Sequence, residues 1–160
     1  MKSQLLLGLL RISVGWIFLW AFFDKLLGLG FATTPDKSWL SGASPTFGFL
    51  HFGTTGTFSP FFKSLAGNLL VDWLFMLGLL GIGIAFTLGI ARKIATLCAT
   101  LLLFLMWFAL FPPKNNPIID EHIIYILALQ LLFQLHSGEA LGLGKWWDKT
   151  ELVKKYSFLK

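Results

Sequence analysis

One short segment of the chain gathers amides, carboxylates and a histidine. It runs Asn115-Asn116-Pro117-Ile118-Ile119-Asp120-Glu121-His122 and leads into an apolar stretch. A histidine beside carboxylates can take up or release a proton near neutral pH. We therefore predict Asp120, Glu121 and His122 as candidate catalytic residues. The same pattern suits a helix start, where the macrodipole favours acidic side chains, and His122 is equally consistent with a structural histidine.

Other ionisable residues are expected at the same level as this segment. Asp24 and Lys25 end the first apolar run, and Asp72 lies near the start of the second. Antiparallel helices bring these ends to one side of a bundle. We therefore predict that Asp72 joins the catalytic carboxylates and that Lys25 binds substrate.

Arg11 interrupts the first apolar run and lies about 10 Å inside it at the rise of an α-helix. An ionisable residue inside a membrane span is costly and is a candidate functional residue by default. The nearest polar residue expected at its depth is Gln130, a neutral amide. A guanidinium facing an amide keeps donors for an anion or a carbonyl oxygen, so Arg11 and Gln130 are predicted to bind substrate. The alternative is that Arg11 extends its side chain toward water.

Resident metal or haem is not expected. His122 and His136 are separated by roughly 21 Å along one helix and cannot ligate one iron together. Asp120, Glu121 and His122 follow one another directly, so their side chains are expected to point in different directions. Cys98 is the only cysteine and forms neither an internal disulfide nor a CxxC pair. Any redox reaction would therefore use a diffusible carrier or a partner subunit.

The composition places these residues in a membrane protein. The 160-residue chain is 56% hydrophobic and 13% charged, and its mean hydropathy is +0.73. A soluble domain of this size cannot bury so much apolar surface. The net charge of +5 forms no basic stripe with base-reading residues, so nucleic-acid binding is not expected.

Four apolar runs predict an all-α, antiparallel four-helix bundle embedded in a membrane as a single domain. The predicted spans cover residues 4–23, 65–90, 94–111 and 118–135. Lysine and arginine are concentrated at the chain ends and in the turn Arg92-Lys93, which places both termini in the cytoplasm. We expect an integral protein of a prokaryotic plasma membrane, in contact with lipid.

The segments outside the spans are rich in aromatic residues. The outer loop, residues 24–64, carries aromatic side chains at a density typical of a lid, a re-entrant segment or an interfacial layer. The cytoplasmic tail, residues 136–160, contains Lys145-Trp146-Trp147-Asp148-Lys149 and resembles an interfacial anchor followed by a short amphipathic stretch. Glycines of the second span permit close helix packing, within the bundle or in a homo-oligomer.

Several blocks resemble the DoxX/DoxD-like membrane proteins. Arg11–Lys25 has the arginine, the glycine four residues later, the aromatics and the final lysine of the family's opening signature. Asp72–Gly78, Pro112–His122 and Gly142–Trp147 resemble later blocks of the same family. The resemblance implies a four-helix membrane bundle related to the membrane subunit of thiosulfate:quinone oxidoreductase. That enzyme joins two thiosulfates into tetrathionate and passes the electrons to quinone.

Three functions are consistent with these features. The first is a quinone-linked oxidoreductase, or its membrane subunit, acting with a small soluble or membrane partner on thiosulfate or a similar sulfur compound. Trp16, Trp107 and Tyr125 are then predicted to line an apolar quinone slot. The second is a small-solute or proton-coupled carrier, which would use the same charged residues. The third is a structural subunit of a larger membrane complex.

Overall fold

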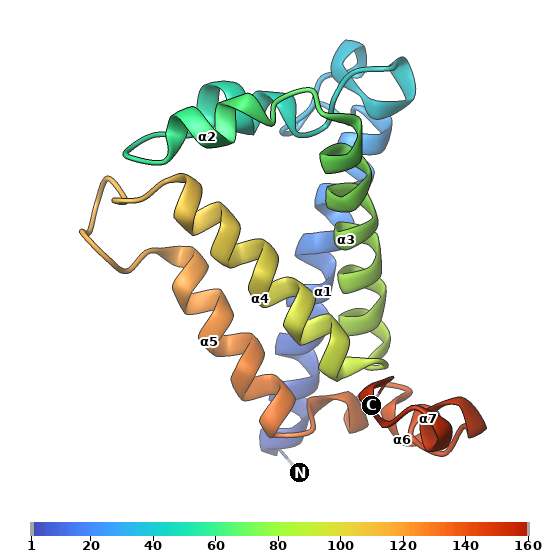
Figure 1. Cartoon of the computed structure of the whole chain (residues 1–160). Helices are drawn as coiled ribbons and strands as arrows, with labels where there is room; N and C mark the ends of the chain where they lie inside the picture. Colours follow the sequence, from blue (N-terminus) through green and yellow to red (C-terminus); the bar gives the residue numbers. More distant parts are fainter. Residues whose placement is uncertain (1, 160) are drawn as a thin grey trace.

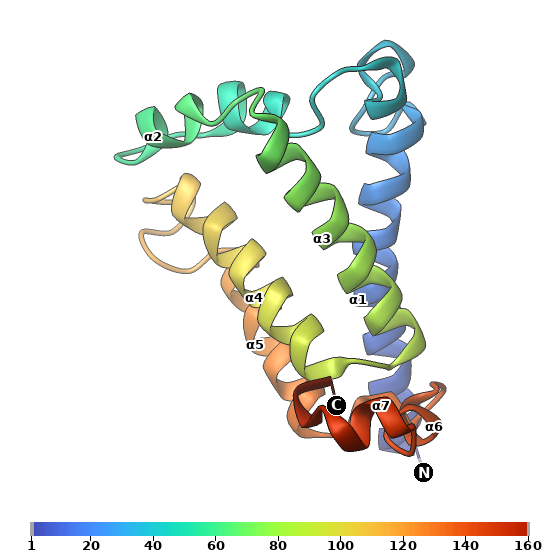
Figure 2. The same ribbon diagram turned by 45° about the vertical axis from the view of Figure 1, so that its right-hand side comes forward.

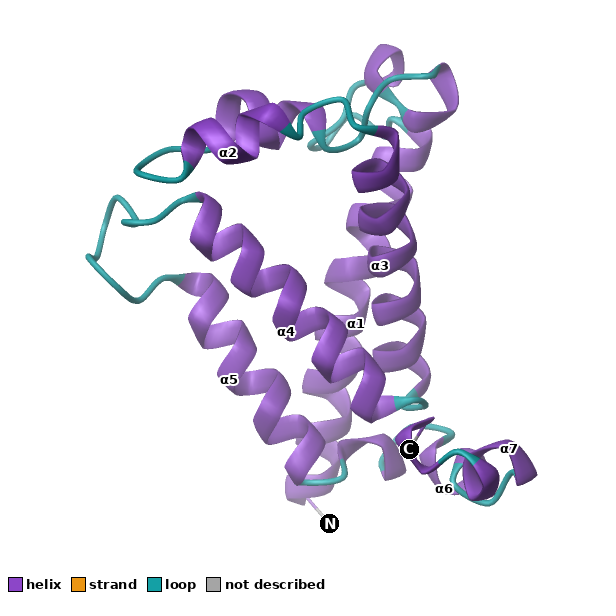
Figure 3. Ribbon diagram, in the orientation of Figure 1, coloured by secondary structure: helices purple, strands orange, loops and turns teal. Residues whose placement is uncertain are grey.

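The computed structural model describes residues 2–159, and within that range all regular secondary structure is helical, the helices are joined by loops and turns, and there is no strand (Figure 3). The main helices are α1 (Lys2–Leu27), α3 (Leu69–Leu88), α4 (Arg92–Ala109) and α5 (Glu121–Gln134). Helices α1, α3 and α4 are long and apolar enough to cross a membrane. The prediction of an all-helical chain with membrane-spanning helices is therefore confirmed at that level.

The fourth predicted span is shorter than expected. Helix α5 has 14 residues and extends about 21 Å, which is less than the roughly 30 Å hydrocarbon core of a bilayer. The helix starts late because two side chains cap the backbone ahead of it. Asn116 Oδ1 accepts from the amides of Ile118 and Ile119, each at 3.0 Å. Asp120 then serves as the N-cap, so the residues before it stay outside the helix.

The helices pack as two pairs, α1 with α3 and α4 with α5 (Figure 1). Both views show the pairs meeting near the end that carries both termini and diverging toward the other end (Figure 2). We call these the inner and outer ends. One apolar core joins the four helices; its fully enclosed members are Met76, Ala99, Leu129 and Leu132.

Glycines allow α1 and α3 to approach closely. A Cβ atom added at Gly83 would lie 2.7 Å from Leu19 Cγ, and one added at Gly15 would lie 2.6 Å from the amide nitrogen of Thr87. Gly78 on the same helix has no neighbour within 4 Å. The glycines of α3 therefore divide into one that contacts α1 and others on the open surface.

The outer loop is a folded segment with several short helices, including a π-helical turn (Gly48–Gly53) and α2 (Ser59–Ser64). Helix α2 lies beside the outer end of α4 (Figure 1), where the rings of Phe58 and Phe108 are 4.0 Å apart. Leu50, Phe62 and Ala109 form a small second core beneath it. The loop thus bridges the outer ends of the two helix pairs.

The outward faces of the long helices are apolar. Leu6, Trp16, Leu74 and Leu97 are each at least half exposed. Large apolar side chains spread along whole helices are typical of surfaces that contact lipid rather than water.

Candidate functional site at the outer end

Asp120 and His122 form a hydrogen-bonded pair at the start of α5. Asp120 Oδ2 lies 2.8 Å from His122 Nδ1, and the two side chains are only 10% and 9% exposed. Asp120 Oδ1 accepts from the amides of His122 at 3.0 Å and Ile123 at 3.4 Å. One carboxylate therefore caps the helix and orients the imidazole at once. The helix-start interpretation is confirmed for Asp120, and it coexists with the pairing to histidine.

The orientation of His122 defines what its second ring nitrogen can do. When Nδ1 carries the proton donated to Asp120, Nε2 is the acceptor of the neutral ring. Nε2 makes no hydrogen bond to any group within residues 2–159. This geometry suits a group that accepts a proton at Nε2 and returns it.

Glu121 is exposed, in contrast to its two neighbours. Three side-chain atoms that could bind a metal, one each from Asp120, Glu121 and His122, all lie within 4.8 Å of one another. The expectation that consecutive side chains would point in different directions is therefore wrong here. Asp120 precedes the helix in extended conformation, with φ −130° and ψ −171°, so helical spacing does not govern its direction. The three atoms can approach one cation, although Asp120 already uses both oxygens within the protein.

A pocket of about 280 Å³ adjoins Asp120, whereas His122 lies behind that carboxylate and is not one of the lining residues. The turn between α4 and α5 supplies most of its polar lining, including Lys114, Asn115 and Asn116. Asp120 and Glu121 line it from the N-terminal end of α5, and Thr55 lines it from the outer loop. The sequence singled out the segment that begins at Asn115. No sequence pattern predicted that Thr55 of the outer loop would line the same pocket as this segment, because that proximity depends on how the loop folds.

Asp72 does not join this group. Its Oδ1 atom accepts from the hydroxyls of Ser44 at 2.8 Å and Thr46 at 2.5 Å, and from the amide of Thr46 at 3.3 Å. Asp24 has a similar role, because its carboxylate accepts hydrogen bonds from the amides of Phe31 and Ala32. Both carboxylates hold the outer loop on α1 and α3. Asp72 is therefore a loop anchor, which corrects its predicted place beside Asp120.

Arg11 is completely buried at the inner end, and its partners are backbone carbonyls. Nη1 donates to Phe86 and, at 3.0 Å, to Thr87, two of the last carbonyls of α3. Nε donates to Ser137 at 3.1 Å, and Nη2 donates to Ala140 and Leu141 at 3.0 and 3.1 Å. A guanidinium has five N–H donors, so these five bonds match its full capacity.

The expectation that Arg11 keeps donors for a ligand is therefore wrong. Carbonyl groups at the C-terminus of a helix lack partners within the helix and carry partial negative charge. Arg11 satisfies them and joins α1, α3 and the chain after α5. Its predicted partner Gln130 instead donates from Nε2 to Thr100 Oγ1 at 3.0 Å and links α5 to α4.

The remaining predicted substrate residues are dispersed. Trp16 and Tyr125 are 53% and 40% exposed, and neither lines a described pocket. Trp107 donates from Nε1 to the carbonyl of Ile118 at 2.8 Å and so stabilises the turn between α4 and α5. Lys25 is half-buried on α1 next to Asp24. Within residues 2–159, these side chains do not assemble into one slot.

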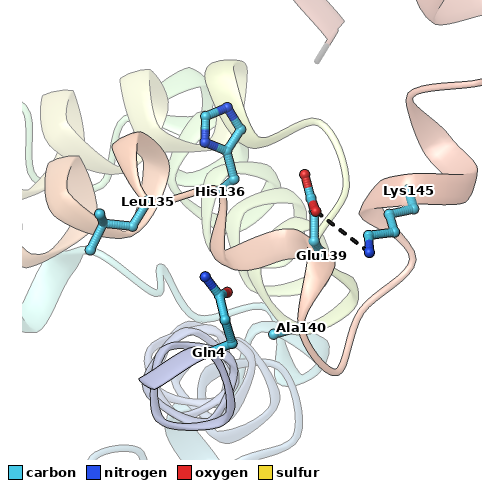
Figure 4. A pocket seen from close by; sticks show the side chains of 6 residues that line it. All are labelled: Gln4, Leu135, His136, Glu139, Ala140 and Lys145. Atoms are coloured by element: carbon cyan, nitrogen blue, oxygen red, sulfur yellow. Dashed lines mark ion pairs between the residues drawn. The ribbon is translucent and has the colours of Figure 1, made fainter. Parts of the chain in front are cut away.

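A second pocket, of about 230 Å³, lies at the inner end (Figure 4). Gln4 of α1 faces His136 and Glu139 across it, and Lys145 approaches Glu139 to 3.7 Å. His136 has φ +51°, a left-handed conformation that is uncommon for a residue with a side chain. No sequence pattern predicts this pocket, because it forms only where the chain after α5 returns onto α1.

No family model, curated protein or solved structure matches this chain.

Proposed function

We propose that the chain is the membrane subunit of a quinone-linked oxidoreductase in which Asp120 and His122 exchange protons with the quinone at the outer surface. The observation that carries this proposal is the 2.8 Å contact between the largely buried Asp120 and His122 side chains, with Asp120 also lining the outer pocket. The resemblance to DoxX/DoxD-like proteins supports the same reaction class, with thiosulfate or a similar sulfur compound as electron donor. A four-helix membrane bundle with an aromatic outer loop is part of this proposal.

The pocket offers the groups that the reaction needs. Conversion of a quinone to a quinol adds two electrons and two protons at its carbonyl oxygens. Lys114, Asn115 and Asn116 supply N–H donors that can hold a carbonyl oxygen or a small anion. His122 takes up a proton from water at Nε2, and Asp120 stabilises the imidazolium that forms. Nε2 then donates this proton to the quinone, and a second round supplies the second proton. The electrons come from the sulfur compound, whose oxidation joins two thiosulfates through a new S–S bond.

The test is quinone reduction in membranes that contain the chain with its native partners. Thiosulfate is added, and reduction of a short-chain ubiquinone is followed by its absorbance. We expect His122→Ala to lower the rate about a hundred-fold or more, in keeping with loss of a general acid–base group. His136→Ala removes the histidine of the inner pocket and is the matched control, with an unchanged rate. Equal rates for the His122 variant and the unaltered chain would refute the proposal.

A small-solute or proton-coupled carrier is the second candidate function. The presence of one pocket at each end of the helices, of about 280 and 230 Å³, favours it. Flux of thiosulfate into liposomes without any electron acceptor distinguishes it from the oxidoreductase. The carrier would show flux that His122→Ala and His136→Ala both reduce, whereas the oxidoreductase would show none.

A further inference from the structure

The chain after α5 folds back onto the inner end as a fixed element rather than a loose tail. Leu143 donates its amide to the carbonyl of Leu88 at 2.8 Å, and Arg92 Nη2 lies 2.6 Å from Asp148 Oδ2. Farther along, Trp147 Nε1 donates to the carbonyl of Leu159 at 2.7 Å, and Val153 is 1% exposed. These contacts fix which side of the segment faces outward.

We call the outward side of residues 143–159 the tail surface. It carries large apolar and aromatic side chains that the rest of the protein does not cover. Trp146 is 61% exposed, Leu152 51%, Tyr156 42% and Phe158 52%. Tryptophan and tyrosine are enriched at membrane interfaces because their rings are apolar and their N–H and O–H groups remain hydrated.

Lysines lie among these aromatic residues. Lys145 and Lys154 approach Glu139 and Glu151, and Arg92 is paired with Asp148. Lys149 and Lys155 are exposed and make no ion pair within residues 2–159, and the same holds for Lys93 at the adjoining start of α4. The tail surface therefore has a positive charge that the protein does not neutralise.

The position of the segment agrees with its composition. Helices α6 (Gly144–Trp147) and α7 (Glu151–Lys155) lie at the inner end of the long apolar helices (Figure 2). This is the level at which a helix that crosses a bilayer meets the headgroups. Lysine there meets lipid phosphate, while the aromatic rings reach the boundary with the acyl chains.

We propose that the tail surface binds the headgroups of anionic phospholipids and prefers them to zwitterionic ones. Lys149 and Lys155 provide the preference for negative charge, and Trp146 and Phe158 provide apolar contact that is independent of headgroup charge. Because hydrogen bonds and the Arg92–Asp148 ion pair already hold the segment, binding does not require it to fold.

The test compares phosphatidylglycerol with phosphatidylcholine. The full chain, purified in detergent, is titrated with each lipid, and bound lipid is counted by native mass spectrometry. We expect tighter binding of phosphatidylglycerol, weakened by added salt because exposed charges are screened. The double variant Lys149→Gln/Lys155→Gln should lower its affinity for phosphatidylglycerol about thirty-fold and leave phosphatidylcholine binding unchanged.

The matched control is Lys37→Gln/Lys63→Gln, which removes the same charge from exposed lysines at the outer end. It should keep the affinity for phosphatidylglycerol. Thermal unfolding in detergent alone verifies that both double variants are folded, as expected for exposed side chains. Equal affinity for the two lipids, or an equal loss in both double variants, would overturn the proposal.

Discussion

Arg11 Nε donates to the carbonyl oxygen of Ser137 at 3.1 Å, although 126 positions separate the two residues in the chain. This bond joins α1 to the segment that follows α5. Four further bonds from the same guanidinium tie in the end of α3 and residues 140–141. Within residues 2–159, every hydrogen bond of this guanidinium therefore goes to a backbone carbonyl, whereas Arg92, the other buried arginine at the inner end, is paired with Asp148.

Replacement of Arg11 by lysine should destabilise the protein strongly. Lysine keeps the charge but has three donors, so carbonyls now paired with the guanidinium would lose their partners. We expect a loss of about 3 kcal/mol or more in the free energy of unfolding. The loss of stability is measured by thermal unfolding in detergent, monitored as the decrease of the monodisperse protein peak.

Lys93→Met is the control for Arg11→Lys, because it changes an exposed cation at the same end of the long helices. It should leave the unfolding temperature nearly unchanged. A lysine variant of Arg11 as stable as the unaltered chain would show that the carbonyl cluster does not need the guanidinium.

Gly83→Ala and Gly78→Ala make a matched pair on α3. A Cβ at Gly83 would clash with Leu19, including its backbone nitrogen at 2.9 Å, whereas a Cβ at Gly78 would meet nothing within 4 Å. We expect Gly83→Ala to destabilise the protein by about 1–3 kcal/mol through overpacking. Gly78→Ala should be neutral or slightly stabilising. The test compares the unfolding temperatures of the two variants. Similar decreases in both would contradict the close packing of α1 on α3 at Gly83.

Asp72→Ala should loosen the outer loop while the long helices stay folded. The variant removes the acceptor shared by Ser44 and Thr46 and leaves buried polar groups without a partner. Hydrogen exchange of the amides around Thr46 should become at least about tenfold faster, because the free energy of opening the loop falls by about 1.4 kcal/mol. Asp36→Ala, at an exposed position of the same loop, should leave these amides protected. Unchanged exchange in the Asp72 variant would argue against the anchor.

Asp120 has two roles that substitution can separate. Asparagine retains an oxygen that accepts from the amides of His122 and Ile123, so Asp120→Asn should keep the stability of the protein. Its amide group would donate to His122 Nδ1 and thereby place the ring proton on Nε2, so quinone reduction should fall steeply. Asp120→Ala should lose the cap as well, at about 1 kcal/mol of stability.

Both readouts are needed for Asp120. Unfolding temperature reports the cap, and the rate of quinone reduction by thiosulfate reports the pairing with histidine. If Asp120→Asn retained full activity, the carboxylate would act only as the helix cap.

The sequence by itself determined that the protein is suited to a lipid environment and that its secondary structure is helical. Apolar runs of membrane length and the low charge content predicted helices that contact lipid, because backbone groups in hydrocarbon must pair within their own segment. Local chemistry also predicted the cap at Asp120, since that bond joins residues two and three positions apart.

Only the tertiary structure decided which partners the polar residues take. Arg11 meets Ala140, Asp72 meets Thr46 and Gln130 meets Thr100, all through contacts between segments distant in sequence. The partners of Arg11 are backbone carbonyls, which every residue possesses, so no pattern of side chains could identify them. Depth along a helix can be counted from the sequence, whereas the face that a neighbouring segment covers depends on how the helices and loops pack.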